Sequence, residues 1–240
     1  MSNNKVCKFY LQGRCNRGED CKFVHDSEFF KKKKLIKKNT ETFEPSYEPP
    51  DVKIKVGLQD KYEENDIVLI PNLFCEVNDN SIYEKLLFEI QDPNVFKLWH
   101  GDTHLIADDK LNWKEECPTF NMIINKLKET FNMDVKATRF NWYKDTGDWK
   151  PYHHDAAAVD PRKAKIQNFT VGVSFGKERE ASFQHAKTRT VVSIPQPNGQ
   201  IYGFGKCVNI NWRHGIPRIP DSEKEDKGRI SIIALGYVKN

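Results

Sequence analysis

The chain has 240 residues, with 38 Lys and Arg against 34 Asp and Glu, and a net charge of +4. Its mean hydropathy is −0.71, and no apolar run approaches the roughly 18 residues of a helical membrane span, which excludes that class of protein. The charge is uneven, because residues 1–40 hold 11 basic and 4 acidic residues, whereas residues 41–240 hold 27 and 30. A strongly basic arm therefore precedes a nearly neutral body, which favours an anionic partner such as nucleic acid.

The first predicted element is a small zinc site. Four residues follow the spacing C-x7-C-x5-C-x3-H: Cys7, Cys15, Cys21 and His25. Three thiolates and one imidazole close a tetrahedral shell, as in structural zinc sites, and so short a segment needs the metal to fold. A disulfide framework is the alternative, but no secretory signal precedes these cysteines. Three further cysteines lack ligand spacing and are interpreted as free thiols in a reducing compartment: Cys75, Cys117 and Cys207.

Residues 7–25 resemble the CCCH zinc fingers in spacing, glycines and aromatic residues. Fingers of that family usually bind single-stranded RNA, and the residue types agree, because aromatic rings stack on bases and cations pair with phosphates. The candidate nucleic-acid contacts are Phe9, Tyr10, Phe23, Lys8, Arg14, Arg17 and Lys22. A finger that docks onto protein, with the aromatic residues as its core, is the alternative.

A basic run and a proline-rich segment follow. Residues 31–38 contain six lysines, which suit a phosphate-binding tail or a nuclear-localisation signal, although a solvated charge run is the plainer alternative. Residues 39–51 contain three prolines, as in an extended linker. We predict a zinc finger over 1–26, a linker over 27–55 and one domain over 56–240. We expect a monomer inside the cell, in the cytoplasm or the nucleus.

The body combines two helices with many short strands. Apolar spacing predicts a strand over 66–70 and helices over 77–90 and 118–131. Beyond residue 135, short apolar runs predict strands at 136–143, 169–175, 190–194, 200–203, 207–212 and 229–238. This pattern predicts a mainly β fold with flanking helices, of which a jelly roll is one form, with its core over 135–240.

Three residues of the body have the spacing of iron ligands. His153 and Asp155 form an H-x-D pair, and positions two apart on a strand point the same way, so both can bind one ion. His214 would complete a 2-His-1-carboxylate triad, which is diagnostic of Fe(II) oxygenases. His185 is the rival third ligand, and His154 should face the other side of the strand.

Arg229 follows His214 by 15 residues and precedes an apolar run. A guanidinium beside such an iron suits the carboxylate of a cosubstrate, since the two groups pair through two hydrogen bonds. The plain alternative is an arginine that ends a strand.

Residues 67–240 resemble the AlkB-type Fe(II)/2-oxoglutarate dioxygenases, which are built on a double-stranded β-helix. The resemblance is carried, in chain order, by Phe131-Asn132, Asn141-Trp142-Tyr143 with Gly147, His153-His154-Asp155, Ser174-Phe175-Gly176, Trp212-Arg213-His214-Gly215-Ile216 and Arg229. It implies iron on His153, Asp155 and His214. It also implies that Arg229 holds a carboxylate of 2-oxoglutarate and that Asn141 and Tyr143 donate hydrogen bonds to it.

The chain departs from the AlkB pattern at two places. The family's repair enzymes have a second arginine six residues after the first, where this chain has Leu235, and many have an acidic residue after H-x-D, where residues 156–158 are all alanine. Residues 96–113 correspond to the family's variable substrate lid. Four residues there could stack on a base or form the lid core: Trp99, His100, His104 and Trp113.

The resemblance implies an enzyme that uses Fe(II), O2 and 2-oxoglutarate, beside a structural zinc ion. Its expected reaction is oxidative demethylation of nucleic acid, with RNA favoured because of the finger. Single strands avoid the cost of flipping a base out of a duplex. Two alternatives stay open: a protein hydroxylase that the finger recruits to RNA, and a catalytically silent RNA-binding adaptor.

Overall fold

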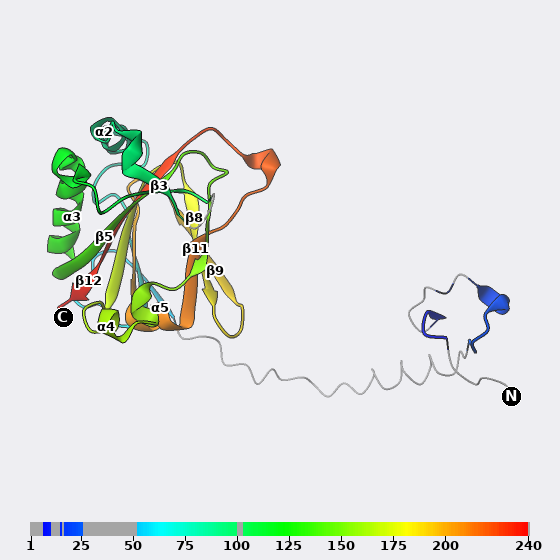
Figure 1. Ribbon diagram of the computed structural model, residues 1–240. Coiled ribbons are helices and arrows are strands. Elements are labelled where there is room, and N and C mark those ends of the chain that lie inside the picture. Colours follow the sequence, from blue (N-terminus) through cyan, green and yellow to red (C-terminus); the bar gives the residue numbers. More distant parts are fainter. Residues whose placement is uncertain (1–6, 11–14, 16, 26–51, 100–102, 240) are drawn as a thin grey trace. The chain divides into compact units, whose positions relative to one another are not determined.

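The computed structural model describes residues 7–10, 15, 17–25, 52–99 and 103–239 (Figure 1). The chain divides into two compact units between Pro49 and Pro50, and each unit is described by itself. Arg14, His100, the lysine-rich run and most of the predicted linker lie outside the described residues. Within the described ranges, no helix has both the length and the apolar composition needed to cross a membrane.

The strands of the described body form two sheets. The larger sheet has the order β1 (Lys53–Val56), β2 (Asp66–Ile70), β10 (Ile201–Gly205), β7 (Phe169–Gly176), β12 (Arg229–Val238), β5 (Met133–Tyr143), β4 (Leu105–Ala107) and β3 (Phe96–Leu98). The smaller sheet has the order β6 (Lys150–His153), β11 (Trp212–Ile216), β8 (Arg179–His185) and β9 (Val191–Gln196). The mainly β architecture predicted from the apolar runs is confirmed.

Two helices cover the outer face of the larger sheet, as Figure 1 shows: α2 (Ser81–Glu89) and α3 (Pro118–Thr130). Helix α3 begins at proline, whose missing N–H costs nothing in the first turn. It buries Phe120, Ile123 and Leu127 along one face. The carboxylate of Glu89, at the end of α2, accepts a hydrogen bond of 2.9 Å from the backbone N–H of Thr119 and so ties the two helices together.

The two faces of β12 have different surroundings. Ile230, Ile232 and Ala234 belong to the core beneath the helices. Arg229, Ser231, Ile233 and Leu235 alternate with them and line the space between the two sheets. Because side chains alternate along a strand, a single strand contributes both to the core and to the site.

The predicted strand at 207–212 is wrong. Residues Lys206–Asn211 form the short helix α5, and strand β11 begins at Trp212. Val208, Ile210 and Trp212 alternate with polar residues as a strand would, but the backbone N–H groups of Cys207 and Val208 donate to the carbonyl of Glu64 instead of to a sheet. Tertiary contacts therefore override the local pattern, leaving Ile210 exposed.

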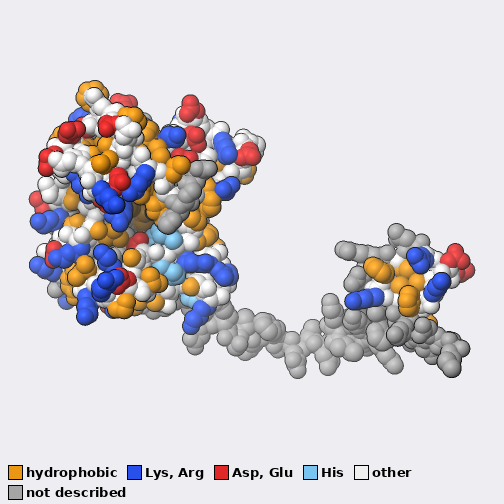
Figure 2. Space-filling model, viewed as in Figure 1, with side chains coloured by type: hydrophobic (Ala, Val, Ile, Leu, Met, Phe, Trp, Pro, Cys, Tyr) orange, Lys and Arg blue, Asp and Glu red, His pale blue; other side chains and the backbone are white. Residues whose placement is uncertain are grey.

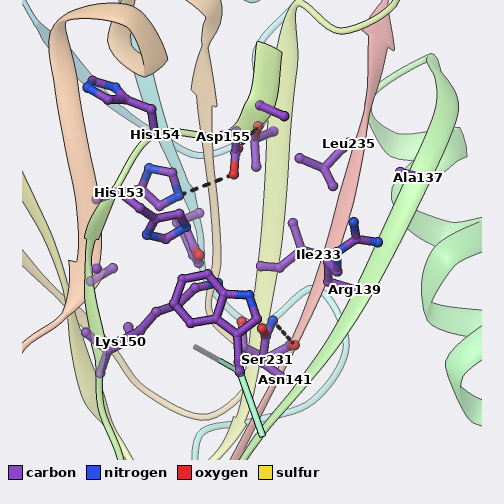
Figure 3. Close-up of a pocket in the computed structure, with 18 of the residues that line it drawn as sticks. Ala137, Arg139, Asn141, Lys150, His153, His154, Asp155, Ser231, Ile233 and Leu235 are labelled. Atoms are coloured by element: carbon purple, nitrogen blue, oxygen red, sulfur yellow. Dashed lines mark hydrogen bonds and ion pairs between the residues drawn. The ribbon is translucent and has the colours of Figure 1, made fainter. Parts of the chain in front are cut away.

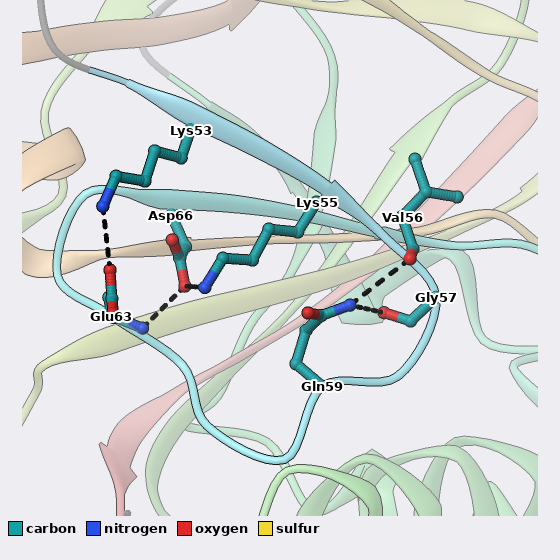
Figure 4. Close-up of polar contacts among 7 residues, drawn as sticks. All are labelled: Lys53, Lys55, Val56, Gly57, Gln59, Glu63 and Asp66. Atoms are coloured by element: carbon teal, nitrogen blue, oxygen red, sulfur yellow. Dashed lines mark hydrogen bonds and ion pairs between the residues drawn. The ribbon is translucent and has the colours of Figure 1, made fainter.

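The first strand of the body begins inside the segment predicted as a linker. Strand β1 pairs in parallel with β2, Lys53 with Asp66 through Val56 with Leu69. Figure 4 shows the contacts that hold this edge: Lys55 lies 2.8 Å from the buried carboxylate of Asp66, which also accepts from the N–H of Glu63. Lysines on an edge strand also discourage pairing with other chains.

Candidate active site

Three potential metal ligands meet between the two sheets. His153 ends β6, His214 lies opposite it on β11, and Asp155 follows β6 in an extended conformation. Their ligand atoms all lie within 4.8 Å of one another, and His214 Nε2 is 3.6 Å from Asp155 Oδ1. Two imidazoles and a carboxylate arranged in this way suit a divalent transition metal.

The surrounding residues fix these side chains. Nδ1 of His153 donates to the Pro151 carbonyl at 3.0 Å, which leaves Nε2 free to bind a metal. Oδ2 of Asp155 accepts from the Thr170 hydroxyl at 2.8 Å, and the Asp155 N–H donates to the Asn209 side chain at 2.9 Å. Helix α5, absent from the predicted elements, thus supplies the residue that holds the Asp155 backbone.

The electrostatics of the cluster suit a cation. Burial, together with the neighbouring His214 imidazole and the Lys150 charge, lowers the pKa of His153 to about 2, so its imidazole is neutral. Burial alone would raise the pKa of Asp155, but the His214 imidazole and the Thr170 hydroxyl outweigh it, and the pKa falls below its usual range. The cluster therefore offers a metal the charge of the Asp155 carboxylate and the unprotonated nitrogen of His153.

A pocket of about 240 Å³ extends from this cluster between the sheets, and Arg229 lines it as well. The arginine is 1 % exposed, and its Nε donates to the Ser174 hydroxyl at 2.8 Å. Its two terminal nitrogens have no hydrogen-bond partner among the described residues, although they are buried. Buried charged donors are almost always satisfied, so these two nitrogens indicate a site for an anionic ligand.

Asn141 and Tyr143 lie beside Arg229 on the neighbouring strand. The guanidinium carbon of Arg229 is 5.0 Å from the centre of the Tyr143 ring. Asn141 Nδ2 donates to the Ser231 carbonyl at 3.1 Å, and Asn141 Oδ1 lies 3.3 Å from His104 Nε2. The structure brings both residues into the pocket, but one amide hydrogen of Asn141 is already used within the protein.

The lid residues separate into two groups. Trp113 packs against Phe120 and Phe140 in the core. His104 is buried and stacks on Tyr143 with ring centres 4.7 Å apart, and burial with the Lys150 charge lowers its pKa to about 3. Only Trp99, of the described lid aromatics, lines the pocket, where its ring meets that of His153 edge to face at 5.4 Å.

The other two histidines lie apart from the metal cluster. His154 points away from the cluster (Figure 3), and its Nδ1 donates to the Asn209 carbonyl at 2.6 Å. His185, at the end of β8, contacts Thr188 and packs on Trp212. Neither belongs to the group of residues whose ligand atoms converge.

Sequence reasoning missed Lys150, which lines the pocket three residues before His153. Burial lowers its pKa to about 8. Residues three apart on a regular strand point to opposite faces, so the sequence offered no reason to place Lys150 beside His153. An irregularity in the pairing of β6 with β11 separates the two residues and breaks that alternation. Leu235, in the place of the second arginine, is half-buried and lines the same pocket.

The N-terminal unit contains the second convergent group. The ligand atoms of Cys7, Cys15, Cys21 and His25 lie within 4.8 Å of one another. Nε2 of His25 is buried and has no hydrogen-bond partner among the described residues, as expected of a nitrogen that faces a metal. The Tyr10 N–H donates to Cys7 Sγ at 3.4 Å. Burial by itself would raise the pKa of Cys7, but contacts with Tyr10 and His25 lower it to about 6. The lower pKa favours the thiolate form that zinc binding requires.

The candidate nucleic-acid residues of the finger are mostly exposed. Phe9 is 64 % and Phe23 47 % exposed, and Lys8, Arg17 and Lys22 are exposed as well. Tyr10 differs, since its ring stacks on His25 at 4.1 Å and so supports the metal site. Large exposed aromatic rings in so small a unit are available for stacking.

Comparisons with known proteins support both units. Residues 7–25 match the family model of a CCCH zinc finger domain. A solved structure titled "The structure of OsALKBH1", an AlkB homologue, is 12% identical over 73% of this chain and 100% of that chain, with a TM-score of 0.50. No curated protein matches the sequence. The chain therefore joins a CCCH zinc finger to a body that shares the fold of an AlkB homologue.

Proposed function

We propose that the protein is an Fe(II)- and 2-oxoglutarate-dependent dioxygenase that oxidatively demethylates nucleic acid, with single-stranded RNA as the favoured substrate. The observation that carries the proposal is one pocket with two complementary features. His153, Asp155 and His214 converge on it, and Arg229 lines it with two buried nitrogens that have no hydrogen-bond partner in the described part of the chain. A 2-oxo acid with a second carboxylate would satisfy both.

The residues that line the pocket would have two roles, metal binding and cosubstrate binding. His153, Asp155 and His214 would hold Fe(II), which when bound lets O2 oxidise both 2-oxoglutarate and a methyl group. Arg229 would hold a carboxylate of 2-oxoglutarate against Tyr143. One oxygen atom enters succinate as CO2 leaves, and the other converts N–CH3 to N–CH2OH, which releases formaldehyde.

Support for a nucleic-acid substrate comes from the finger and from the pocket rim. The finger exposes Phe9 and Phe23 beside three cations. In the body, Figure 2 shows histidine side chains reaching the surface with Lys and Arg side chains on either side. Trp99 lines the pocket together with His153 and His214, so an unpaired base could stack on an aromatic ring there.

The test is mass spectrometry of nucleosides from methylated RNA and DNA incubated with the full-length protein, Fe(II), ascorbate and 2-oxoglutarate. We expect loss of an N-methyl nucleoside with equal amounts of succinate and formaldehyde, and no reaction with the His153→Ala variant. Succinate without formaldehyde, formed with a protein substrate, would favour a hydroxylase. No succinate with any substrate would favour a silent adaptor.

A further inference from the structure

The pocket contains more positive charge than its own residues neutralise. Asp155 is the one acidic residue among the described residues that line it, and it belongs to the candidate metal cluster. Four cations line the same pocket: Arg139, Lys150, Lys163 and Arg229. Arg229 therefore does not account for the whole charge of the site.

The charges of two of these cations are stabilised without a bound ligand. Arg139 donates to the Asp109 carboxylate at 2.6 Å, and 46 % of its side chain is exposed. Lys163 is exposed to water on α4 (Pro161–Ala164). Water or an acidic partner stabilises both charges, so neither indicates a bound anion.

Lys150 differs from both, because it is neither fully exposed nor joined to an acid by an ion pair among the described residues. No carboxylate of the described residues lies within ion-pair distance of its ammonium group, which instead sits 4.9 Å from the centre of the Trp99 ring. The side chain of Lys150 is half-buried, and burial lowers its pKa to about 8, although the charge of Asp155 opposes this shift. A lysine that lines a pocket without an acidic partner among the described residues is explained if it pairs with an anionic ligand.

The backbone directs Lys150 into the pocket beside the metal cluster. Lys150 pairs with Ile216, and His153 with His214, on either side of an irregularity in the β6–β11 pairing. Gly215 permits this close approach, because a Cβ there would lie 2.6 Å from the Lys150 carbonyl. Figure 3 shows Lys150 and His153 on one wall of the pocket, facing Arg139, Ile233 and Leu235 on the other.

We propose that Lys150 is a second binding residue for the acidic cosubstrate, and that its ammonium group contacts a carboxylate of 2-oxoglutarate. The inference rests on the proposed function and extends it to a residue outside the Arg229 strand. Six residues beyond Arg229, β12 presents the apolar Leu235. Lys150 on β6 would supply, from the opposite wall of the pocket, the positive charge that Leu235 does not provide.

The test compares three full-length variants with the wild type: Lys150→Met, Lys150→Arg and, as a matched control from the same pocket, Lys163→Met. Binding of 2-oxoglutarate is measured by calorimetry without O2, with Mn(II) in place of Fe(II) to prevent turnover. We expect Lys150→Met to weaken binding about ten- to a hundredfold, and Lys163→Met to change it less than about threefold. Mn(II) affinity should stay unchanged in both, and the unfolding temperature of metal-free Lys150→Met should not fall.

Each other outcome has a definite meaning. If the wild type does not bind 2-oxoglutarate, the proposed function itself fails. If the wild type binds it and Lys150→Met binds it equally well, only the role of Lys150 is overturned, and a raised KM for RNA in that variant would assign the lysine to the substrate. If Lys150→Met proves unstable, Lys150→Arg decides: retained affinity supports the role of the charge, and lost affinity refutes it.

Discussion

His153 and His214 reach one another from neighbouring strands because the register of β6 and β11 places them opposite each other. Their ring centres are 4.3 Å apart, and His214 is also packed against Phe204. Asp155 joins them from two residues past the end of β6, where its own backbone is extended. The candidate metal site is thus fixed by backbone pairing and by the hydrogen bonds behind His153 and Asp155.

Replacement of any one of these three residues by Ala should abolish Fe(II)-dependent turnover of 2-oxoglutarate, because a facial triad has no spare ligand. His154→Ala and His185→Ala should retain it, since neither side chain lies in the cluster. The measurement is succinate formation, with metal content determined for each variant. Full activity in His214→Ala would remove that residue from the site.

Arg229→Met keeps much of the side-chain volume but removes a buried charge, two of whose nitrogens have no hydrogen-bond partner within the described ranges. We expect the affinity for 2-oxoglutarate to fall about ten- to a hundredfold, as for the loss of a charged hydrogen bond to a ligand. Metal affinity should be unchanged, because the arginine contacts none of the three candidate ligands in the described structure. Titration of the metal-loaded variant with 2-oxoglutarate measures the effect, and an unchanged affinity would mean that another cation holds the cosubstrate.

At the scale of elements, the site depends on how closely β6 approaches β11. Gly215 lies next to His214, and a Cβ there would meet backbone atoms of Lys150 and Pro151, which cannot move aside alone. At Gly147, by contrast, an added Cβ would meet only the ends of the Asp145 and Lys224 side chains. Gly147 and Gly215, both part of the AlkB-like pattern, therefore differ in the close contacts that they permit.

Gly215→Ala should force β6 away from β11 and so displace His153. We expect the free energy of unfolding to fall by roughly 1–3 kcal/mol, the usual cost of overpacking, and metal affinity to fall with it. Gly147→Ala is the control and should leave metal affinity unchanged. Denaturant unfolding and metal titration of both variants measure the difference, and equal effects would contradict this account of Gly215.

At the scale of the whole molecule, two compact units share one chain and have separate candidate metal sites. The finger has almost no apolar core, and Cys7 is its one buried apolar residue among those described. The body instead has two extensive apolar cores. The two units should therefore differ in their dependence on metal.

Cys15→Ser should abolish zinc binding by the finger and unfold it, because metal binding supplies most of the folding energy of so small a unit. The body should keep its unfolding temperature, since its own described residues form two extensive apolar cores. Zinc content and thermal unfolding of the full-length variant are the measurements. A body that melts earlier in this variant would show that the units are not independent.

Deletion of residues 1–40 removes a net charge of +7 and should weaken binding of long RNA far more than of a methylated mononucleoside. The KM for a long methylated RNA should rise and its salt dependence should decrease, whereas the KM for the mononucleoside should stay constant. Steady-state kinetics on both substrates at two salt concentrations measure the contrast. Equal losses on both would mean that the arm supports the catalytic body instead.

The sequence by itself determined the features that repeat locally or depend on fixed spacing. Zinc-ligand spacing, the H-x-D pair, the apolar face of α3 and strand β12 could all be recognised in this way, because each is set by covalent order and side-chain periodicity. The strand predicted at 207–212 failed because its alternating pattern also fits one turn of helix, and contacts with Glu64 decide between them.

Only the tertiary structure decided which residues share the pocket. Register places His153 opposite His214, and the irregularity beside Gly215 turns Lys150 into the pocket. Burial separates Trp99, which lines the pocket, from His104 and Trp113, which do not. These outcomes depend on contacts between residues far apart in the chain. Local propensity and spacing carry no information about such contacts. The set of residues that share the pocket is therefore fixed only when the two sheets pack together.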